Sequence, residues 1–528
     1  MRSDVIRIYK NLHTWTGLVS GMALFICFYA GALSMFKEPL SRWATPPAEQ
    51  QQWVSPEQWS ELIQTTLVRH PEAADAFILH VEQREHTVAP LVWANGEPRL
   101  RVAPQAWATL DEDGELITGE SRPAPLAELI DLLHQTAGIP GGGHHYLGVY
   151  IMGAVCALYF LALVSGLIVL LPTLVKDLFA VRPGHNRKRF WLDTHNVVGL
   201  ASLPFHLVIA LSTIVFAFHD QIYDGLQKLV YPDRPLWERS ESDLTPRSVE
   251  ALLPPAQLLA LLTQVAPDFE PREMHFHDVN TAAAEVRIYG ETLWQPQRDG
   301  ARGLAIMNPY GGEMMNTAYL PGHENDWTAI INTFFALHFG NYGGALTQWA
   351  YLLLGLGGAF IFYSGNLLWI EARRRRQRGS DSVTQKRATV VMAAITVGVC
   401  WGSVAGISSA AVAGKWLTSS GLDLQTVYMT TYYSVFLGAV AWAFLRSAAA
   451  AAVDLLWLSA VATFAIPLTG VLALLVPGLA VWLHLAPDLL LIEATALVFS
   501  VIFACMARRT ARRLASNNAD TVWSVAAA

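Results

Sequence analysis

Eight stretches of mostly apolar residues recur along the chain. They cover residues 15–36, 147–171, 197–218, 346–370, 390–412, 427–445, 455–476 and 489–506. Each is close to the length of about 20 residues that a helix needs to cross a hydrocarbon core of about 30 Å. The pattern predicts an α-helical polytopic membrane protein with about eight transmembrane helices.

Basic residues gather at the ends of some of these stretches. The segments KDLFAVRPGHNRKRF, EARRRRQR and ARRTARR follow the second, fourth and eighth stretches, whereas the long segments 37–145 and 219–345 are mixed or acidic. Because Lys and Arg favour cytoplasmic loops, both termini are predicted to be cytoplasmic and both long segments to lie outside. The first stretch is expected to be a retained anchor and not a cleaved leader, since a similar helix recurs at 197–218.

The chain also resembles itself. HTWTGL matches HNVVGL, WATLDEDGELITG matches LAIMNPYGGEMMN, and LLHQTAGIPGG matches ALHFGNYGG, while the second and fourth stretches each carry a Ser-Gly pair near their ends. The shared order predicts an internal parallel repeat with units 1–171 and 172–378. Residues 379–528 have no counterpart and are predicted to form an appended four-helix transmembrane bundle with a basic cytoplasmic tail.

Each long segment opens with a helix-like pattern, PEQWSELIQTTLVRH in one and PPAQLLALLTQVAP in the other. Alternating polar and apolar residues follow, as in TVAPLVWA and AEVRIYG, and this alternation is typical of half-buried strands. Segments 37–145 and 219–345 are therefore predicted to be two small α+β modules.

Four histidines hold equivalent repeat positions. His13 and His195 stand at the cytoplasmic ends of the first and third stretches, and His134 and His338 stand just before the second and fourth. One such histidine alone would more commonly be an ordinary polar residue at the membrane surface. In pairs, two neutral imidazoles can fill both axial positions of a haem iron, which favours electron transfer over oxygen chemistry. We therefore expect two non-covalent haem b groups, one held by His13 with His195 and one by His134 with His338.

Other residues leave alternatives open. His206 lies near the middle of the third stretch, where an ionisable group is costly and usually functional, so it could replace one of the four ligands or lie between two haems. On a continuous helix it would return to nearly the same face as His195. His144 and His145 could serve the outer site. Gly17 and Gly199 would let a macrocycle or a neighbouring helix approach closely.

Composition narrows the class. The chain has 528 residues, 53% of them hydrophobic, and a formal net charge of -7, which argues against a nucleic-acid partner. Its four cysteines lie in apolar stretches and form no C-x-x-C-H motif. No nucleotide-binding or hydrolase motif occurs, so the electrons must come from an external donor: a flavoprotein, a soluble reductant or a quinol. The pair His275 and His277 could bind a metal weakly, although such pairs are more often incidental.

The order of H-x-x-x-G-L, a helix-and-strand module, Leu-His and Ser-Gly resembles the PepSY-associated transmembrane family over about residues 1–378. It is similar in particular to the siderophore reductases of ferrioxamine and ferrichrome uptake. The resemblance implies a two-haem protein of the bacterial inner membrane, with periplasmic modules, that passes electrons from the cytoplasm to a ferric siderophore or similar chelate and releases Fe(II). It also implies His13, His134, His195 and His338 as the ligands.

The sequence departs from the family pattern at two places. The extra segment GIPGGGHH leaves the partner of His338 open among His134, His144 and His145. The appended bundle could form a quinol site or a subunit contact, or simply add bulk. Two other functions also stay open. One is a transporter with a midplane site at His206, although no discontinuous helix is evident from the sequence. The other is a non-enzymatic regulator whose modules bind a periplasmic peptidase.

Overall fold

The computed structural model describes residues 2–84, 87–94, 105–141, 147–177, 180–182, 187–233, 243–292, 303–320, 322–375, 386–476 and 478–515. The chain forms two compact units. A helical unit comprises Met1–Ala44, Ala124–Ile222 and Trp349–Ala528, and a sheet unit comprises Thr45–Pro123 and Tyr223–Gln348.

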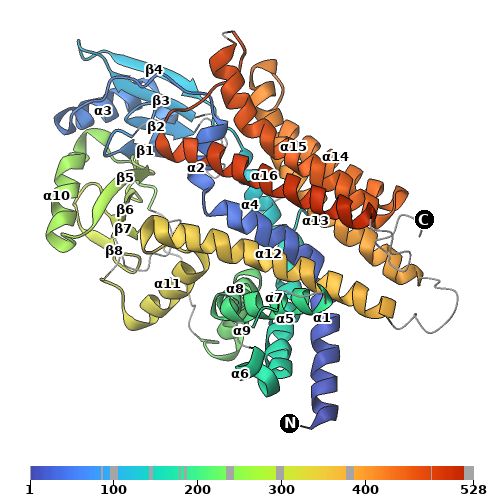
Figure 1. Cartoon of the computed structure of the whole chain (residues 1–528). Helices are drawn as coiled ribbons and strands as arrows, with labels where there is room; N and C mark the ends of the chain where they lie inside the picture. The colour runs from blue at the N-terminus through green and yellow to red at the C-terminus, as the bar shows by residue number, and fades with distance from the viewer. Residues whose placement is uncertain are drawn as a thin grey trace. The chain divides into compact units, whose positions relative to one another are not determined.

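Seven helices among the described residues are long and apolar enough to cross a membrane. They are α1 (Ser3–Ser34), α5 (Leu147–Leu170), α12 (Gly344–Arg375), α13 (Arg387–Leu417), α14 (Leu424–Leu445), α15 (Ala448–Leu475) and α16 (Pro487–Ala515), as Figure 1 shows. Each overlaps one predicted stretch, which confirms the class of helical membrane protein. Several continue past the apolar stretch, because polar residues can extend a helix beyond the lipid.

The third predicted stretch is not one straight helix. It covers the end of α7 (Arg187–Ala201) and all of α8 (Leu203–Ala217), and these two helices are bent by 66° at the intervening Ser202. Pro204 explains the bend, since proline lacks an amide hydrogen and its ring collides with the carbonyl four residues earlier. Counted as one span, the bent pair brings the total to eight.

This break corrects two sequence-based expectations. A discontinuous helix is present in the membrane-spanning region, although none was evident from the sequence. His206 also does not continue the helical face of His195, because the 66° bend separates the two residues.

The appended bundle is built into the helical unit. α13 packs against α1, and Cys400 and Trp401 of α13 share one apolar core with Phe25 and Phe28 of α1. Within the bundle, glycines let α13 approach α14 closely. A Cβ atom would lie 2.7 Å from Val440 at Gly398, 2.9 Å from Ala439 at Gly402 and 2.9 Å from Tyr432 at Gly406. Small residues at this spacing are typical of tightly packed membrane helices.

A buried ion pair within this bundle also contacts Trp43 of α2 (Lys37–Ala44), the short helix that follows α1. The fully buried Lys415 of α13 donates from Nζ to the Trp482 carbonyl at 3.1 Å, and this Nζ lies 3.8 Å from Glu493 Oε1 and 4.0 Å from the centre of the Trp43 ring. Trp43 Nε1 in turn donates to Glu493 Oε1 at 2.7 Å. The charges are therefore compensated within a polar and aromatic cluster.

Shorter helices complete the α-helices of the described residues. They are α3 (Trp59–Arg69), α4 (Leu126–Thr136), α6 (Leu174–Asp177), α9 (His219–Leu229), α10 (Pro255–Val265) and α11 (Asp326–Phe339). α3 and α10 arise from the two helix-like patterns that the sequence predicts at the start of the long segments.

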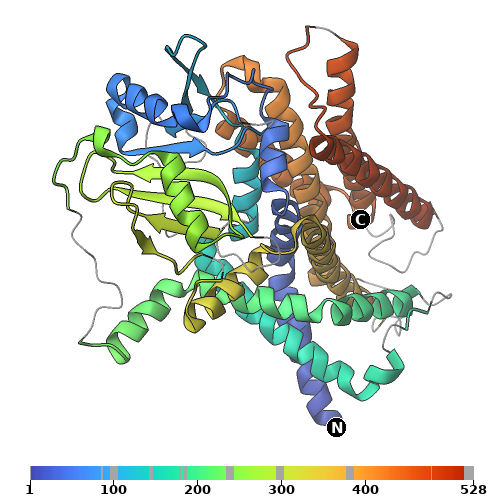
Figure 2. The ribbon, with the colours of Figure 1, turned by 90° about the vertical axis from the view of Figure 1, so that its left-hand side faces the viewer.

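The described residues of the sheet unit form one eight-stranded antiparallel sheet in the order β4-β3-β2-β1-β5-β6-β7-β8, with the strands labelled in Figure 1. Figure 2 shows its blue and green strands from the side. The first long segment contributes β1 (Ala76–His80), β2 (Leu91–Ala94), β3 (Gln105–Leu110) and β4 (Leu116–Ser121). The second contributes β5 (Glu270–His277), β6 (Glu285–Glu291), β7 (Gly303–Met307) and β8 (Met314–Asn316). The two predicted modules thus share one sheet, joined where β1 pairs with β5.

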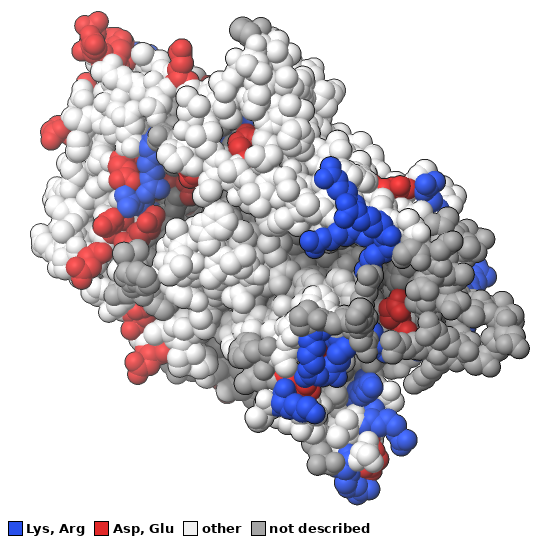
Figure 3. All heavy atoms as spheres, viewed as in Figure 1, with Lys and Arg blue, Asp and Glu red and all other residues white. Residues whose placement is uncertain are grey.

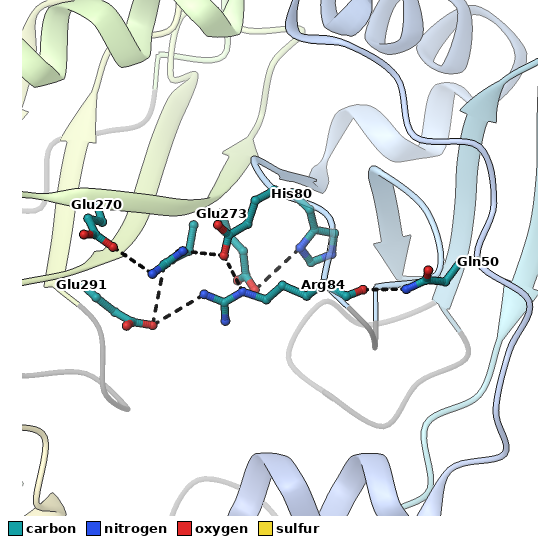
Figure 4. Close-up of polar contacts among 8 residues, drawn as sticks. Gln50, His80, Arg84, Glu270, Glu273 and Glu291 are labelled. Atoms are coloured by element: carbon teal, nitrogen blue, oxygen red, sulfur yellow. Dashed lines mark hydrogen bonds and ion pairs between the residues drawn. The ribbon is translucent and has the colours of Figure 1, made fainter. Parts of the chain in front are cut away.

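Two kinds of contact hold this β1–β5 seam. The apolar core of the sheet unit contains residues of α3, α10 and the strands. In this core, Phe77 of β1 and Phe276 of β5 lie opposite each other across the seam, and their rings stack with centroids 4.7 Å apart. At its end, Arg272 of β5 pairs with Glu82 beyond β1 and with Glu270, and Arg84 pairs with Glu82 and Glu291 (Figure 4). Ion pairs therefore cross from one half of the sheet to the other.

Charge is unevenly distributed over the surface. Lys and Arg gather over the N-terminal end of α1 and the C-terminal end of α16, whereas Asp and Glu are spread over the sheet unit (Figure 3). This distribution is the one that the positive-inside rule uses to orient a membrane protein.

Candidate functional site

His13 of α1 and His195 of α7 face each other in the helical unit. Their ring centroids are 6.4 Å apart and the ring planes lie at 76°. The structure therefore brings together the two residues that the sequence paired for the inner site, from helices far apart along the chain.

Each of these rings is held through its Nδ1 atom. His13 Nδ1 lies 2.8 Å from the Ala162 carbonyl oxygen, to which it donates. His195 Nδ1 lies 2.9 Å from Ser364 Oγ, whose own hydrogen goes to the Ile361 carbonyl, so the serine oxygen accepts from the imidazole. A proton on Nδ1 leaves the lone pair of a neutral imidazole on Nε2, which is the arrangement of a metal-ligating histidine with an outer partner.

Glycines on the neighbouring spans make room for the rings. A Cβ atom at Gly166 would lie 2.9 Å from His13 Nδ1, and one at Gly365 would lie 3.4 Å from His195 Cε1. These glycines belong to the two Ser-Gly pairs that recur in the sequence. The Ser-Gly pairs therefore contact the two histidines directly, a role that was not predicted from the sequence.

His134 of α4 repeats this arrangement. Its Nδ1 lies 3.0 Å from the Cys27 carbonyl oxygen of α1, and a Cβ atom at Gly31 would lie 2.6 Å from the same Nδ1. In both cases the accepting carbonyl, Cys27 or Ala162, precedes the glycine by four residues. A histidine can reach a helical carbonyl at this position because the glycine one turn later has no side chain to block it.

His206 of α8 is held differently. It is fully buried, and both of its ring nitrogens lack a hydrogen-bond partner. Aromatic rings surround it, with centroids 5.3 Å away at Phe28 and Phe205 and 6.0 Å away at Tyr159. An unsatisfied buried polar group costs about 1–3 kcal/mol, so two orphaned nitrogens point to a partner that protein atoms do not supply.

The remaining predicted residues have separate outcomes. Gly17 has open space where a Cβ would project, and at Gly199 only the tip of Ile361 comes within 4.0 Å. Both positions leave room beside the inner pair. His338 lies in the last turn of α11 in the sheet unit, so its pairing with His134 stays a prediction. His144 and His145 lie outside the described residues.

A buried aspartate near the inner pair was missed from the sequence. Asp193 precedes His195 by two residues and is 2% exposed. It forms an ion pair with Arg189, with Nε and Oδ1 2.9 Å apart, and accepts a hydrogen bond from the Arg182 backbone amide at 3.2 Å. Asp177 pairs with the same two arginines. The spacing of Arg189 and Asp193, one helical turn apart, was the readable signal.

The histidines of β5 form no metal centre. His275 Nε2 lies 2.9 Å from Glu273 Oε2, and burial together with nearby Arg287 lowers the pKa of His277. In the part of the chain that the structure describes, no group of three or more His, Cys, Asp or Glu side chains is arranged to hold a metal ion. The weak metal site considered for this strand therefore has too few ligands.

The inner pair can be tested against the geometry of haem. Two axial imidazoles on one iron place their ring centres about 6 Å apart, since each metal–nitrogen bond is about 2 Å and the ring centre lies about 1 Å beyond it. The observed 6.4 Å agrees with this distance. The Nδ1 contacts of His13 and His195 leave both Nε2 atoms available as ligands, which also fits a haem. The open space at Gly17 fits a flat macrocycle.

These features define a helical membrane protein with seven or eight spans and an antiparallel sheet region. Within that class, the family described as the PepSY-associated TM region matches residues 10–372, and the chain belongs to this family. The match includes His13, His134, His195, His206 and His338 and ends before α13, so the four last helices lie outside it. No curated protein matches the chain.

Proposed function

We propose that this protein is a di-haem transmembrane electron conduit that reduces a ferric siderophore or another ferric chelate. The observation that carries the proposal is the separation of 6.4 Å between the rings of His13 and His195, each with its Nδ1 engaged elsewhere. Haem b supplies one-electron redox chemistry when it is bound.

Residues of this chain would hold the haem in a way that favours electron transfer over oxygen binding. The Ala162 carbonyl and Ser364 hydroxyl fix the orientation and tautomer of His13 and His195, so that both Nε2 atoms can act as axial ligands. If His13 and His195 both held the iron, protein ligands would leave no site for oxygen, and the haem would supply electron transfer.

A second haem would use His134, which has the same Nδ1 arrangement, with His338 as the expected partner. His206 is the alternative, supported by its two unpartnered nitrogens, and His144 and His145 are further alternatives. Two haems at different depths would divide a hydrophobic thickness of about 30 Å into shorter electron transfers. The donor would be a cytoplasmic flavoprotein, another soluble reductant or a quinol.

Reduction would release iron for a simple chemical reason. Hydroxamate-type oxygen donors bind Fe(III) far more tightly than Fe(II), so adding one electron loosens the chelate. In the proposed topology the sheet unit lies in the periplasm, on the side where the chelate arrives, and the membrane is the bacterial inner membrane.

The test begins with the haem content of the purified full-length protein. We expect about two haem b groups per chain, and loss of about one in each of His13→Ala and His195→Ala. His70→Ala, a substitution in the sheet unit, is the matched control and should keep both. Two haems retained in both inner variants, or a colourless protein from haem-replete cells, would contradict the proposal.

A second experiment tests electron transfer itself. Proteoliposomes loaded with reductant should reduce an external ferric hydroxamate, followed with an iron(II)-specific dye, and those carrying His13→Ala should lose most of this rate. An equal rate in protein-free liposomes would remove the support for a conduit.

One observation favours a second candidate function. The break before Pro204 makes His206 the fourth residue in the second half of a discontinuous helix, an arrangement that many transporters use for substrate sites near the midplane. A transporter would move its substrate across liposomes without haem and would lose flux in His206→Phe. If haem is present and flux is absent, this alternative is rejected.

A further inference from the structure

Two short helices flank the second long segment at the ends of its membrane spans. α9 begins at His219, two residues after the end of α8, and α11 ends at Phe339, five residues before α12 begins. Their positions along the chain keep both helices close to the ends of membrane-spanning helices that carry exposed apolar side chains, such as Leu211 of α8 and Leu353 of α12.

α11 has an inverted burial pattern. It buries the polar Asn332, whose Nδ2 donates to the Ala318 carbonyl at 3.0 Å. It exposes large apolar side chains, with Trp327 71% exposed and Ile330 62% exposed. In water this pattern would be unfavourable, because apolar area of this size is normally removed from solvent.

α9 is amphipathic and buries none of its residues. Ile222, Leu226 and Leu229 follow a spacing of four and three residues and therefore form one apolar stripe, with Leu229 85% exposed. Lys228 stands in the last turn. A basic residue beside an apolar stripe is typical of helices that lie in the membrane interface.

The helices that flank the first long segment, α2 and α4, have buried apolar faces. α2 buries Trp43, and α4 buries Leu129, Ile130 and Leu133 in one core with residues of α13 and α14. The appended bundle therefore covers the apolar faces of α2 and α4. In the described part of the chain, the apolar stripes of α9 and α11 have no such cover.

We propose that α9 and α11 lie in the outer interface of the bilayer and that lipid covers their apolar stripes. Lipid is favoured over a second copy of this chain for two reasons. Both helices lie next along the chain to the apolar spans α8 and α12. They also carry Trp327 and Lys228, residue types that anchor helices at headgroup level. The consequence is a second attachment of the sheet unit to the membrane surface, which would fix the depth of His338 at the end of α11.

The test uses fluorophore labels on full-length protein in nanodiscs of phosphatidylethanolamine and phosphatidylglycerol. Single cysteines replace Ile330, Leu229 or Val68 in a Cys505→Ser background, since Cys27, Cys156 and Cys400 are buried. Val68 of α3 is the matched control, because it is an aliphatic residue of the sheet unit that is 77% exposed. Quenching by spin-labelled lipid is compared with quenching by aqueous iodide.

We expect the labels at 330 and 229 to be quenched several-fold more by lipid and several-fold less by iodide than the label at 68. A label at 330 that iodide reaches as easily as the one at 68 would overturn the proposal. Protection from both quenchers would also overturn it, because a protein surface would then cover the helix. If labelling at 330 disturbs the fold, intrinsic tryptophan fluorescence replaces the label. Brominated lipid should then quench the fluorescence of the unmodified protein more than that of Trp327→Phe. None of these outcomes depends on haem.

Discussion

The Nδ1 atom of His134 lies 3.0 Å from the carbonyl oxygen of Cys27, in the helical turn that precedes Gly31. His13 stands in the same relation to Ala162 and Gly166. A carbonyl followed four residues later by glycine thus forms a seat for an imidazole on the neighbouring span. Because the carbonyl accepts a hydrogen bond from Nδ1, the proton is on Nδ1, and the lone pair of Nε2 is free to bind a metal.

The first prediction concerns the glycines of these seats. Gly31→Ala would place a Cβ atom 2.6 Å from His134 Nδ1, and Gly166→Ala would place one 2.9 Å from His13 Nδ1, so each ring must move. We expect each variant to lose haem from its own site, measured as haem per chain. Gly438→Ala is the control, because nothing lies within 4 Å of its Cβ position and alanine favours the helix by about 1 kcal/mol. Full haem content in both seat variants would show that the seats do not position ligands.

The second prediction concerns the buried ion pair between Lys415 and Glu493. Lys415→Met would leave Glu493 without its counter-charge, and breaking a buried pair in this way costs about 3–5 kcal/mol. We expect a large drop in the thermal unfolding midpoint of the purified protein. The double variant Lys415→Met/Glu493→Gln should recover much of the loss, whereas the exposed Lys386→Met should have little effect. A double variant no more stable than the single would argue against charge compensation as the role of the pair.

The third prediction concerns the seam of the sheet. Phe276→Ala removes one ring of the stacked pair with Phe77, and truncation of a buried phenylalanine costs about 3–5 kcal/mol. The sheet unit should become sensitive to protease at lower temperature. Ile117→Ala, a substitution of a partly exposed side chain in β4, is the control and should leave the protease pattern unchanged. Equal resistance in the two variants would mean that the seam does not limit the stability of this unit.

The fourth prediction is the response of the seam to acid. Burial alone would raise the pKa of Glu82, but Arg84 and Arg272 outweigh it and hold this pKa below its usual value. A carboxyl with a lowered pKa in the folded state stabilises the protein above the pKa of the unfolded chain, about 4.3 for glutamate, and this stabilisation is lost as the pH falls through the folded pKa. We expect Glu82→Gln to weaken the protein near neutral pH and to flatten the acid limb of its stability profile. Because Glu82 is partly exposed, high salt should reduce the effect. Parallel acid limbs in the two proteins would exclude this contribution.

Sequence reasoning located the membrane spans because lipid imposes a long apolar run on any helix that crosses it. It gave α13 to α16 within a few residues at most ends, and it paired His13 with His195 through the recurrence of one short motif. The Ser-Gly pairs were noticed as landmarks only. Their contact with the histidines depends on which helices become neighbours, and periodicity within one helix does not carry that information.

Two features were missed from the sequence for different reasons. The bend at Pro204 was readable in principle, since proline inside an apolar run breaks the hydrogen-bond ladder, but hydropathy hides it because proline adds no charge. The β1–β5 pairing joins strands from different long segments, and strand alternation reports which residues face the core without reporting which strand lies alongside.

The position of β1 in the middle of the sheet has a consequence for biogenesis. Its partner β5 is synthesised only after α5, α7 and α8 have been made, so a nascent chain displays β1 as an unprotected edge during that interval. Such an edge is a template for strand addition by other chains. Cells producing this protein must therefore either insert the later spans rapidly or shield the half-finished sheet with a chaperone.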